Sequence, residues 1–110
     1  MTDFIEITFT TDSIEEARKI ALFLVEERLV ACAQIIPNIE SIYLWKEKIE
    51  TSQESKILLK THKEKQKTVE QSIRELHSYD VPEILVFPIE NGNPQYLEWM
   101  NEVMTTKRKG

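Results

Sequence analysis

Residues 30–50 read VACAQIIPNIESIYLWKEKIE, and this stretch decides the fold. It is rich in β-branched and aromatic residues, which favour strands, and it is followed by the polar residues of a return strand. Pro37 lacks a backbone N–H donor and Asn38 tolerates turn conformations, so we expect a bend or β-bulge there. The sequence therefore predicts a long hairpin with strands over 31–36, 40–49 and, returning, 54–60.

The elements on either side of the hairpin complete an alternating pattern. Ser13 followed by Glu16 fits a capping box and predicts the start of a helix that ends near Leu29. Apolar periodicity and turn residues predict the other elements, namely a strand over 3–10, a helix over 63–77, a strand over 83–89 and a helix opening at Pro94. We interpret the chain as one domain, residues 1–110, of the α+β class. Its order βαββαβ plus a C-terminal helix indicates a ferredoxin-like split βαβ sandwich with an antiparallel sheet.

The hairpin carries more apolar surface than a small sheet can cover. Its large apolar side chains are Ile39, Ile42, Tyr43, Leu44, Trp45 and Ile49. A patch of this size on a monomer is an aggregation hazard, whereas a second subunit would both cover it and pair its free edge. The sequence therefore predicts an oligomer.

Composition narrows the classes of function. The chain has 14 basic and 19 acidic residues, a net charge of −5, so neither nucleic acid nor an anionic membrane is an expected partner. No apolar run approaches the roughly 18 residues of a membrane span, and the first residues are unlike a secretory signal. The single cysteine excludes an internal disulfide and fits a reducing compartment, so we expect a cytoplasmic protein. With only two glycines, a phosphate-binding loop for an organic nucleotide cofactor is not expected.

Two positions could carry chemistry. Residues 77–83, HSYDVPE, concentrate an imidazole, a phenol and carboxylates after a helix, which suits a binding cleft. The alternative is structural, with His77 at the helix C-terminus and Asp80 in a turn before Pro82. Cys32 is either a small buried residue of the hairpin or a functional thiol.

Four ordered segments together resemble the CutA divalent-cation-tolerance family. They are LVACAQIIPNIESIYLWKEKIE (29–50), ESKILLKT (54–61), HSYDVPEILVFPIENG (77–92) and YLEW (96–99), and the resemblance runs nearly end to end. It implies a homotrimer whose β arms extend each sheet across its neighbours, a role in the response to metal ions, and no enzymatic activity. It also implies intersubunit clefts bordered by Cys32, Trp45, Lys60, His77, Tyr79 and Glu83.

The resemblance further implies binding of a divalent metal, notably copper, or of a small ligand. Thiolate and imidazole suit copper, which makes Cys32 and His77 the expected metal ligands. One chain cannot complete such a site, so either ligands from several subunits converge or a weak copper site uses His77 with Glu83 or Asp80. Trp45, Lys60, Tyr79 and Glu83 are the residues expected around a small ligand.

Two other functions remain as alternatives. A signalling trimer resembling the nitrogen-regulatory PII proteins would share the fold, although few arginines and glycines are available for a nucleotide. An enzyme could use Tyr79, His77 or Glu83 as acid or base on a small organic substrate, but no activated nucleophile or oxyanion pocket is indicated.

Overall fold

The computed structural model describes residues 2–105, which form an α+β fold with a four-stranded antiparallel sheet. The strands lie in the order β2-β3-β1-β4, and the antiparallel α+β architecture predicted from the sequence is confirmed. In chain order the elements are β1 (Phe4–Thr11), α1 (Ile14–Glu26), β2 (Cys32–Trp45), β3 (Lys48–His62), a 3₁₀ turn (Lys63–Lys65), α2 (Gln66–Leu76), β4 (Ile84–Pro88) and α3 (Pro94–Thr105).

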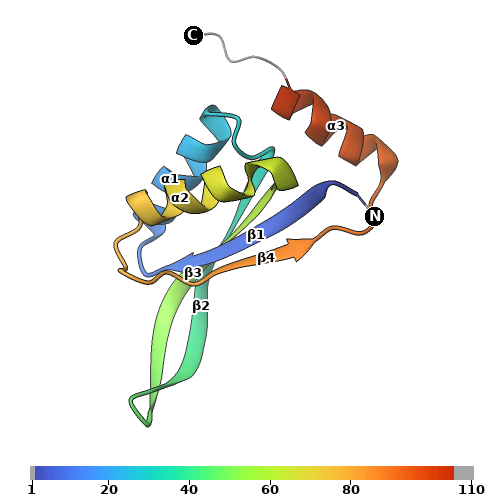
Figure 1. The fold of residues 1–110 in the computed structure, drawn as a ribbon. Helices are drawn as coiled ribbons and strands as arrows, with labels where there is room; N and C mark the ends of the chain where they lie inside the picture. Colours follow the sequence, from blue (N-terminus) through green and yellow to red (C-terminus); the bar gives the residue numbers. More distant parts are fainter. Residues whose placement is uncertain (1, 106–110) are drawn as a thin grey trace.

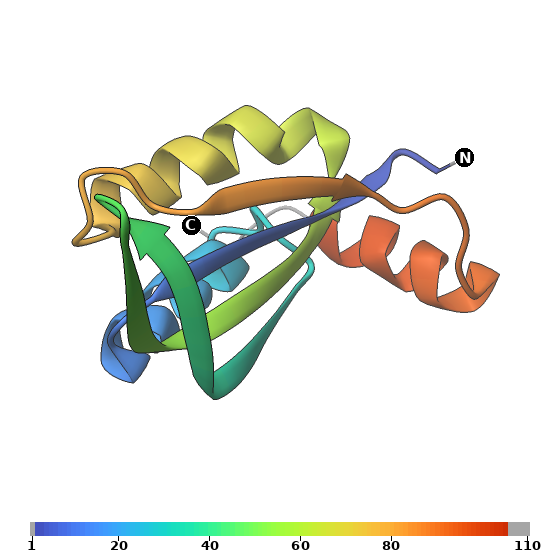
Figure 2. The same ribbon diagram turned by 90° about the horizontal axis from the view of Figure 1, so that it is seen from below.

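The core lies between one face of the sheet and the two helices α1 and α2. It is built from alternate residues of β1 and β3, such as Ile7 and Leu59, and from helix residues such as Ile20 and Ile73. Strand alternation sends the intervening residues to the other face, which no helix of the core covers. Figure 1 shows α1 and α2 side by side, with the distal part of the β2–β3 hairpin extending away from them. Figure 2 shows α3 at the end of the molecule that lies away from the hairpin tip.

The hairpin is longer on its return side than the sequence analysis expected. The return strand begins at Lys48 rather than Glu54, so the prediction that Ile49 belongs to the first arm is wrong, and Ile49 instead faces Leu44 across the hairpin. The two strands are joined by Lys46 and Glu47, which have φ of 50° and 66°. Positive φ at both loop residues matches the hairpin turn of type I′, which the sequence conceals because its usual Asn-Gly pair is absent.

The predicted irregularity at Pro37 and Asn38 is confirmed as a β-bulge. The register of β2 against β3 shifts between Ile36 and Ile39, and Asn38 has a φ of 58°. Ile36 pairs with Lys56 and Ile39 pairs with Glu54, so two residues of β2 oppose one residue of β3. Because alternation has a period of two residues, this insertion places Tyr43 on the same face of the hairpin as Ile36.

Two helix boundaries differ from the expected ones. Helix α1 ends at Glu26 rather than near Leu29, because Arg28 adopts a φ of 56° and the N–H of Leu29 turns back to the carbonyl of Leu24. A left-handed residue in this position ends many helices, usually as glycine. The second helix begins at Gln66, since residues 63–65 form a 3₁₀ turn. Both differences are local and leave the predicted order of elements intact.

Replacing Asn38 tests the backbone geometry of the bulge. We expect Asn38→Val to lower the free energy of unfolding by about 1–2 kcal/mol, because a β-branched residue is strained in the left-handed conformation. The control Asn38→Gly should change stability by less than about 0.5 kcal/mol, since glycine adopts positive φ freely. Urea unfolding at one protein concentration measures both, and equal stability of the two variants would contradict the assigned geometry.

Candidate functional site

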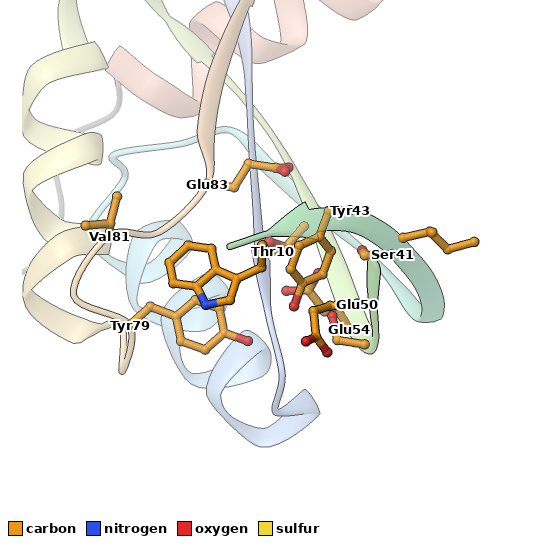
Figure 3. Close-up of a pocket in the computed structure, with 11 residues that line it drawn as sticks. Thr10, Ser41, Tyr43, Glu50, Glu54, Tyr79, Val81 and Glu83 are labelled. Carbon is orange, nitrogen blue, oxygen red and sulfur yellow. The ribbon is translucent and has the colours of Figure 1, made fainter. Parts of the chain in front are cut away.

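A groove lies on the open face of the sheet, where the distal hairpin approaches the loop between α2 and β4. Its volume is about 940 Å³. Tyr43 and Trp45 of β2, with Glu50 and Glu54 of β3, line it from the hairpin side. Figure 3 shows Tyr79 and Val81 on the loop side, with the Tyr79 hydroxyl directed toward the side chains of the hairpin. The bulge makes this groove possible, because it places Tyr43 on the same face as its partner Glu50 and their neighbour Glu54.

Tyr79 is the most strongly perturbed side chain of the groove. Burial, followed by the charges of Asp12 and Glu54 and by the nearby Tyr43, raises the pKa of Tyr79 to about 12. Burial and negative charge both disfavour a phenolate. Tyr79 therefore stays neutral at physiological pH and links the loop to the carboxylate of Glu54.

His77 lies behind Tyr79 and uses both of its ring nitrogens inside the protein. Its Nε2 lies 2.6 Å from the carbonyl oxygen of Thr10, and its Nδ1 accepts a hydrogen bond of 3.0 Å from the N–H of Tyr79. The carbonyl can only accept, so Nε2 carries the proton and the ring is the neutral tautomer. The side chain is 8% exposed, and its ring meets that of Tyr79 edge-on with centroids 4.7 Å apart. His77 therefore positions the loop that carries Tyr79.

Cys32 and Lys60 lie together at the opposite end of the same sheet face. They are direct cross-strand partners in β2 and β3. The Lys60 ammonium forms an ion pair of 3.4 Å with Glu6 and donates a hydrogen bond to the side-chain oxygen of Gln34. The half-buried Cys32 thiol lies near Tyr96 of α3, whose pKa is raised by burial and by the charge and hydrogen bond of Cys32. The rise of about 3.3 Å per strand residue separates Lys60 from Glu54 by about 20 Å.

Within one subunit, the residues predicted around the clefts thus fall into separate groups. Trp45, Tyr79 and Glu83 meet in the groove, with His77 supporting it from behind, while Cys32 and Lys60 are paired elsewhere. The sequence analysis missed Tyr43, Glu50 and Glu54 as groove residues. The pairing of Tyr43 with Glu50 depends on the turn at Lys46 and Glu47, which the sequence does not reveal.

A metal centre is not preformed in the described part of the chain. Among residues 2–105, no group of three His, Cys, Asp or Glu side chains lies close enough to hold a metal ion. Cys32 and His77, the predicted ligands, lie at opposite ends of the sheet, beside Lys60 and Thr10 respectively. A site that used either of them would need further ligands from another subunit or from water. Over the same residues, no helix is long and apolar enough to cross a membrane.

Comparison with known proteins gives one consistent result. The model of a family described as "CutA1 divalent ion tolerance protein" matches residues 5–103. The chain is 43% identical over 96 residues to the divalent-cation tolerance protein CutA of Thermus thermophilus, a match that covers 87% of this chain and 93% of that one. It is 42% identical over 87 residues to protein CutA of Mus musculus, with 79% of this chain covered, and it spans about half of the mouse protein, 49%. A crystal structure of CutA1 from Ehrlichia chaffeensis superposes with a TM-score of 0.89 at 32% identity, over 96% of this chain and 99% of that one.

The raised pKa of Tyr79 predicts how stability changes at alkaline pH. Between pH 10 and about 12 the unfolded chain has lost the Tyr79 proton while the folded chain retains it. The folded state then binds more protons, so its stability falls as pH rises through this window. In an absorbance titration of the phenolates, Tyr79→Phe should remove a component that ionises near pH 12, whereas Tyr43→Phe should leave that component in place. Retention of the component in Tyr79→Phe would contradict the assignment.

His77→Ala tests the structural role of the imidazole. The substitution leaves the Thr10 carbonyl and the Tyr79 N–H without their partner in a buried site, and each such group costs about 1–3 kcal/mol. We expect a loss of about 2–4 kcal/mol in the free energy of unfolding. His62→Ala is the control, because His62 is only partly buried and caps a single backbone N–H, and it should cost less than about 1 kcal/mol. Equal losses of unfolding free energy in the two variants would contradict a specific structural role for His77.

Proposed function

The chain belongs to the CutA1 divalent ion tolerance family, and we propose that it acts as a non-enzymatic, cytoplasmic homotrimer that binds a divalent cation or a small ligand at its subunit boundaries. Copper is the cation that the available thiol and imidazole suit best. The observation that carries the proposal is the uncovered apolar surface of the distal hairpin, which borders the groove.

Large apolar side chains near the tip of the hairpin are left mostly exposed by the residues that the structure describes. Ile42, Leu44 and Ile49 are 64%, 71% and 74% exposed. Leu44 and Ile49 are also direct cross-strand partners, so their side chains form one continuous patch. Monomeric proteins rarely leave such patches open to water. Another copy of this chain supplies the missing cover.

The two edges of the sheet support assembly through the same surfaces. The outer strands are β2 and β4, whose outward backbone groups are available to another subunit. On the open face, Leu85 and Phe87 of β4 are 48% and 47% exposed. The half-buried Cys32 of β2 and Lys60 of β3 lie on the same face. Packing this face against another copy would bring the groove of one subunit toward residues of its neighbour.

Assembly also gives the proposed metal site its missing ligands. Cys32 supplies one soft ligand per subunit, and a closed trimer presents three copies of it around one axis. His77 could ligate only by giving up its hydrogen bonds to Thr10 and Tyr79. Cys32 is therefore the stronger candidate for a ligand at an intersubunit copper site.

The assembly is tested by light scattering after size-exclusion chromatography. We expect a mass of about three times 13.0 kDa at micromolar concentration. Leu44→Asp should dissociate the trimer, because it places a charge in the apolar patch. Leu22→Asp is the matched control, since Leu22 is also well exposed, at 59%, but lies on α1 away from the hairpin. A monomeric wild-type protein would overturn the proposed assembly.

Copper binding is tested by titrating the trimer with Cu(II) and following the thiolate-to-copper charge-transfer absorbance. We expect Cys32→Ser to abolish this absorbance and to weaken binding at least tenfold, because a hydroxyl is a poor ligand for copper. The control is Ser41→Ala, which removes a hydroxyl from the hairpin without removing the thiol. Unchanged affinity in Cys32→Ser would exclude the thiol as a ligand.

A further inference from the structure

The groove between the distal hairpin and the 77–83 loop combines aromatic rings with carboxylates. Its remaining lining is hydroxyl-bearing or apolar, and no lysine or arginine among residues 2–105 lines it. The hairpin and the loop each contribute both kinds of group, so the groove has aromatic and acidic character on both sides (Figure 3). The groups concerned are the rings of Tyr43, Trp45 and Tyr79 and the carboxylates of Glu50, Glu54 and Glu83.

None of the three groove carboxylates takes part in an ion pair among the residues that the structure describes. The ion pairs seen among residues 2–105 use Asp3, Glu6, Glu64 and Glu70 rather than the three groove carboxylates. Carboxylates gathered on one concave surface concentrate a negative potential there, which favours a cationic ligand.

The cation that fits is larger than a metal ion. Glu50, Glu54 and Glu83 do not belong to any set of three potential ligands close enough to hold a metal among the described residues. The groove, at about 940 Å³, has instead the size of sites that take small organic molecules. Its aromatic walls also favour an organic cation, because the faces of Trp and Tyr rings attract organic ammonium groups.

We propose that this groove binds a small organic ammonium ion. The cationic nitrogen lies against the rings of Tyr43, Trp45 and Tyr79. The carboxylates of Glu54, Glu50 and Glu83 balance its charge. The proposal deepens the function proposed above, because it rests on the groove being the small-ligand site and names the chemistry of that ligand. The ammonium group can belong to an aliphatic polyamine or to a quaternary amine, which share this recognition chemistry.

Tyr79 and Glu54 form the part of the groove that is already organised. The phenol and the carboxylate interact between the loop and the hairpin, and His77 fixes the loop from behind by accepting a hydrogen bond from the Tyr79 N–H. A neutral phenol keeps its ring available to a cation without adding a competing charge of its own. The ligand therefore meets a wall whose geometry needs little rearrangement, which lowers the entropic cost of binding.

Calorimetric titration of the wild-type trimer in about 150 mM salt tests the proposal, with spermidine, tetramethylammonium and 1,4-butanediol as probes. We expect saturable binding of at least one of the two cations and none of the uncharged diol. Spermidine binding assigns the site to polyamines, and tetramethylammonium binding assigns it to quaternary amines, so either result supports the proposal. Binding of the diol as tight as that of the cations, or no binding of either cation, would overturn it.

Matched variants separate the groove from the general negative charge of the chain. Glu54→Gln should weaken binding of the cation at least tenfold, and Trp45→Leu about fivefold. Glu40→Gln removes the same charge from the same hairpin, but Glu40 is exposed, pairs with Gln53 and lies on the face opposite the groove. The affinity of this variant for the cation should therefore stay within twofold of wild type. Equal weakening by Glu54→Gln and Glu40→Gln would show nonspecific attraction and reject the site.

Light scattering on the same samples distinguishes this proposal from the assembly on which it rests. A trimer that binds neither cation contradicts the ammonium site while leaving the proposed assembly intact. A monomer that binds a cation in a Glu54-dependent manner contradicts the assembly and supports the site.

Discussion

One inserted residue in β2 sets the arrangement on which the groove depends. At Pro37 and Asn38 two residues oppose one residue of β3, so the side chains of β2 beyond this point exchange faces. Tyr43 and Trp45 thereby join the open face of the sheet, beside Glu50 and Glu54, while Ile42 and Leu44 turn to the other side. The bulge therefore creates both the aromatic and acidic groove and the separate apolar patch, for which we propose a second subunit as the cover.

The position of the groove explains why one subunit does not bring all the cleft residues together. The groove lies at the distal end of the open face, whereas Cys32 and Lys60 lie at the end near α3, about 20 Å away along the strands. His77 holds the loop in place through its hydrogen bonds to the Thr10 carbonyl of β1 and to the Tyr79 N–H. The imidazole thus has a structural task that competes with metal binding, whereas the Cys32 thiol interacts with Tyr96 of α3.

Sequence reasoning predicted the features that are encoded locally. The hairpin, its bulge, the capped start of α1 and the order of elements followed from Pro37, Asn38, Ser13 and hydrophobic periodicity. The hairpin turn escaped detection because Lys46 and Glu47 adopt positive φ without glycine or asparagine, and the end of α1 did so because Arg28 occupies a position usually held by glycine. The loop motif drew attention to Tyr79 and Glu83, which line the groove. The hydrogen bond between His77 and Thr10 joins residues far apart in sequence, and no local sequence pattern predicts it.

Tyr43 and Tyr79 both line the groove, and their proximity tests the role of the bulge most directly. Nuclear Overhauser effects between the ring protons of these two residues should appear in the wild-type protein with labelled aromatic side chains. Deleting Asn38 restores simple alternation and turns Tyr43 to the opposite face, so the same cross-peaks should vanish while those within the core between Phe9 and His77 remain. Cross-peaks between Tyr43 and Tyr79 that survive the deletion would show that the inserted residue does not determine the groove.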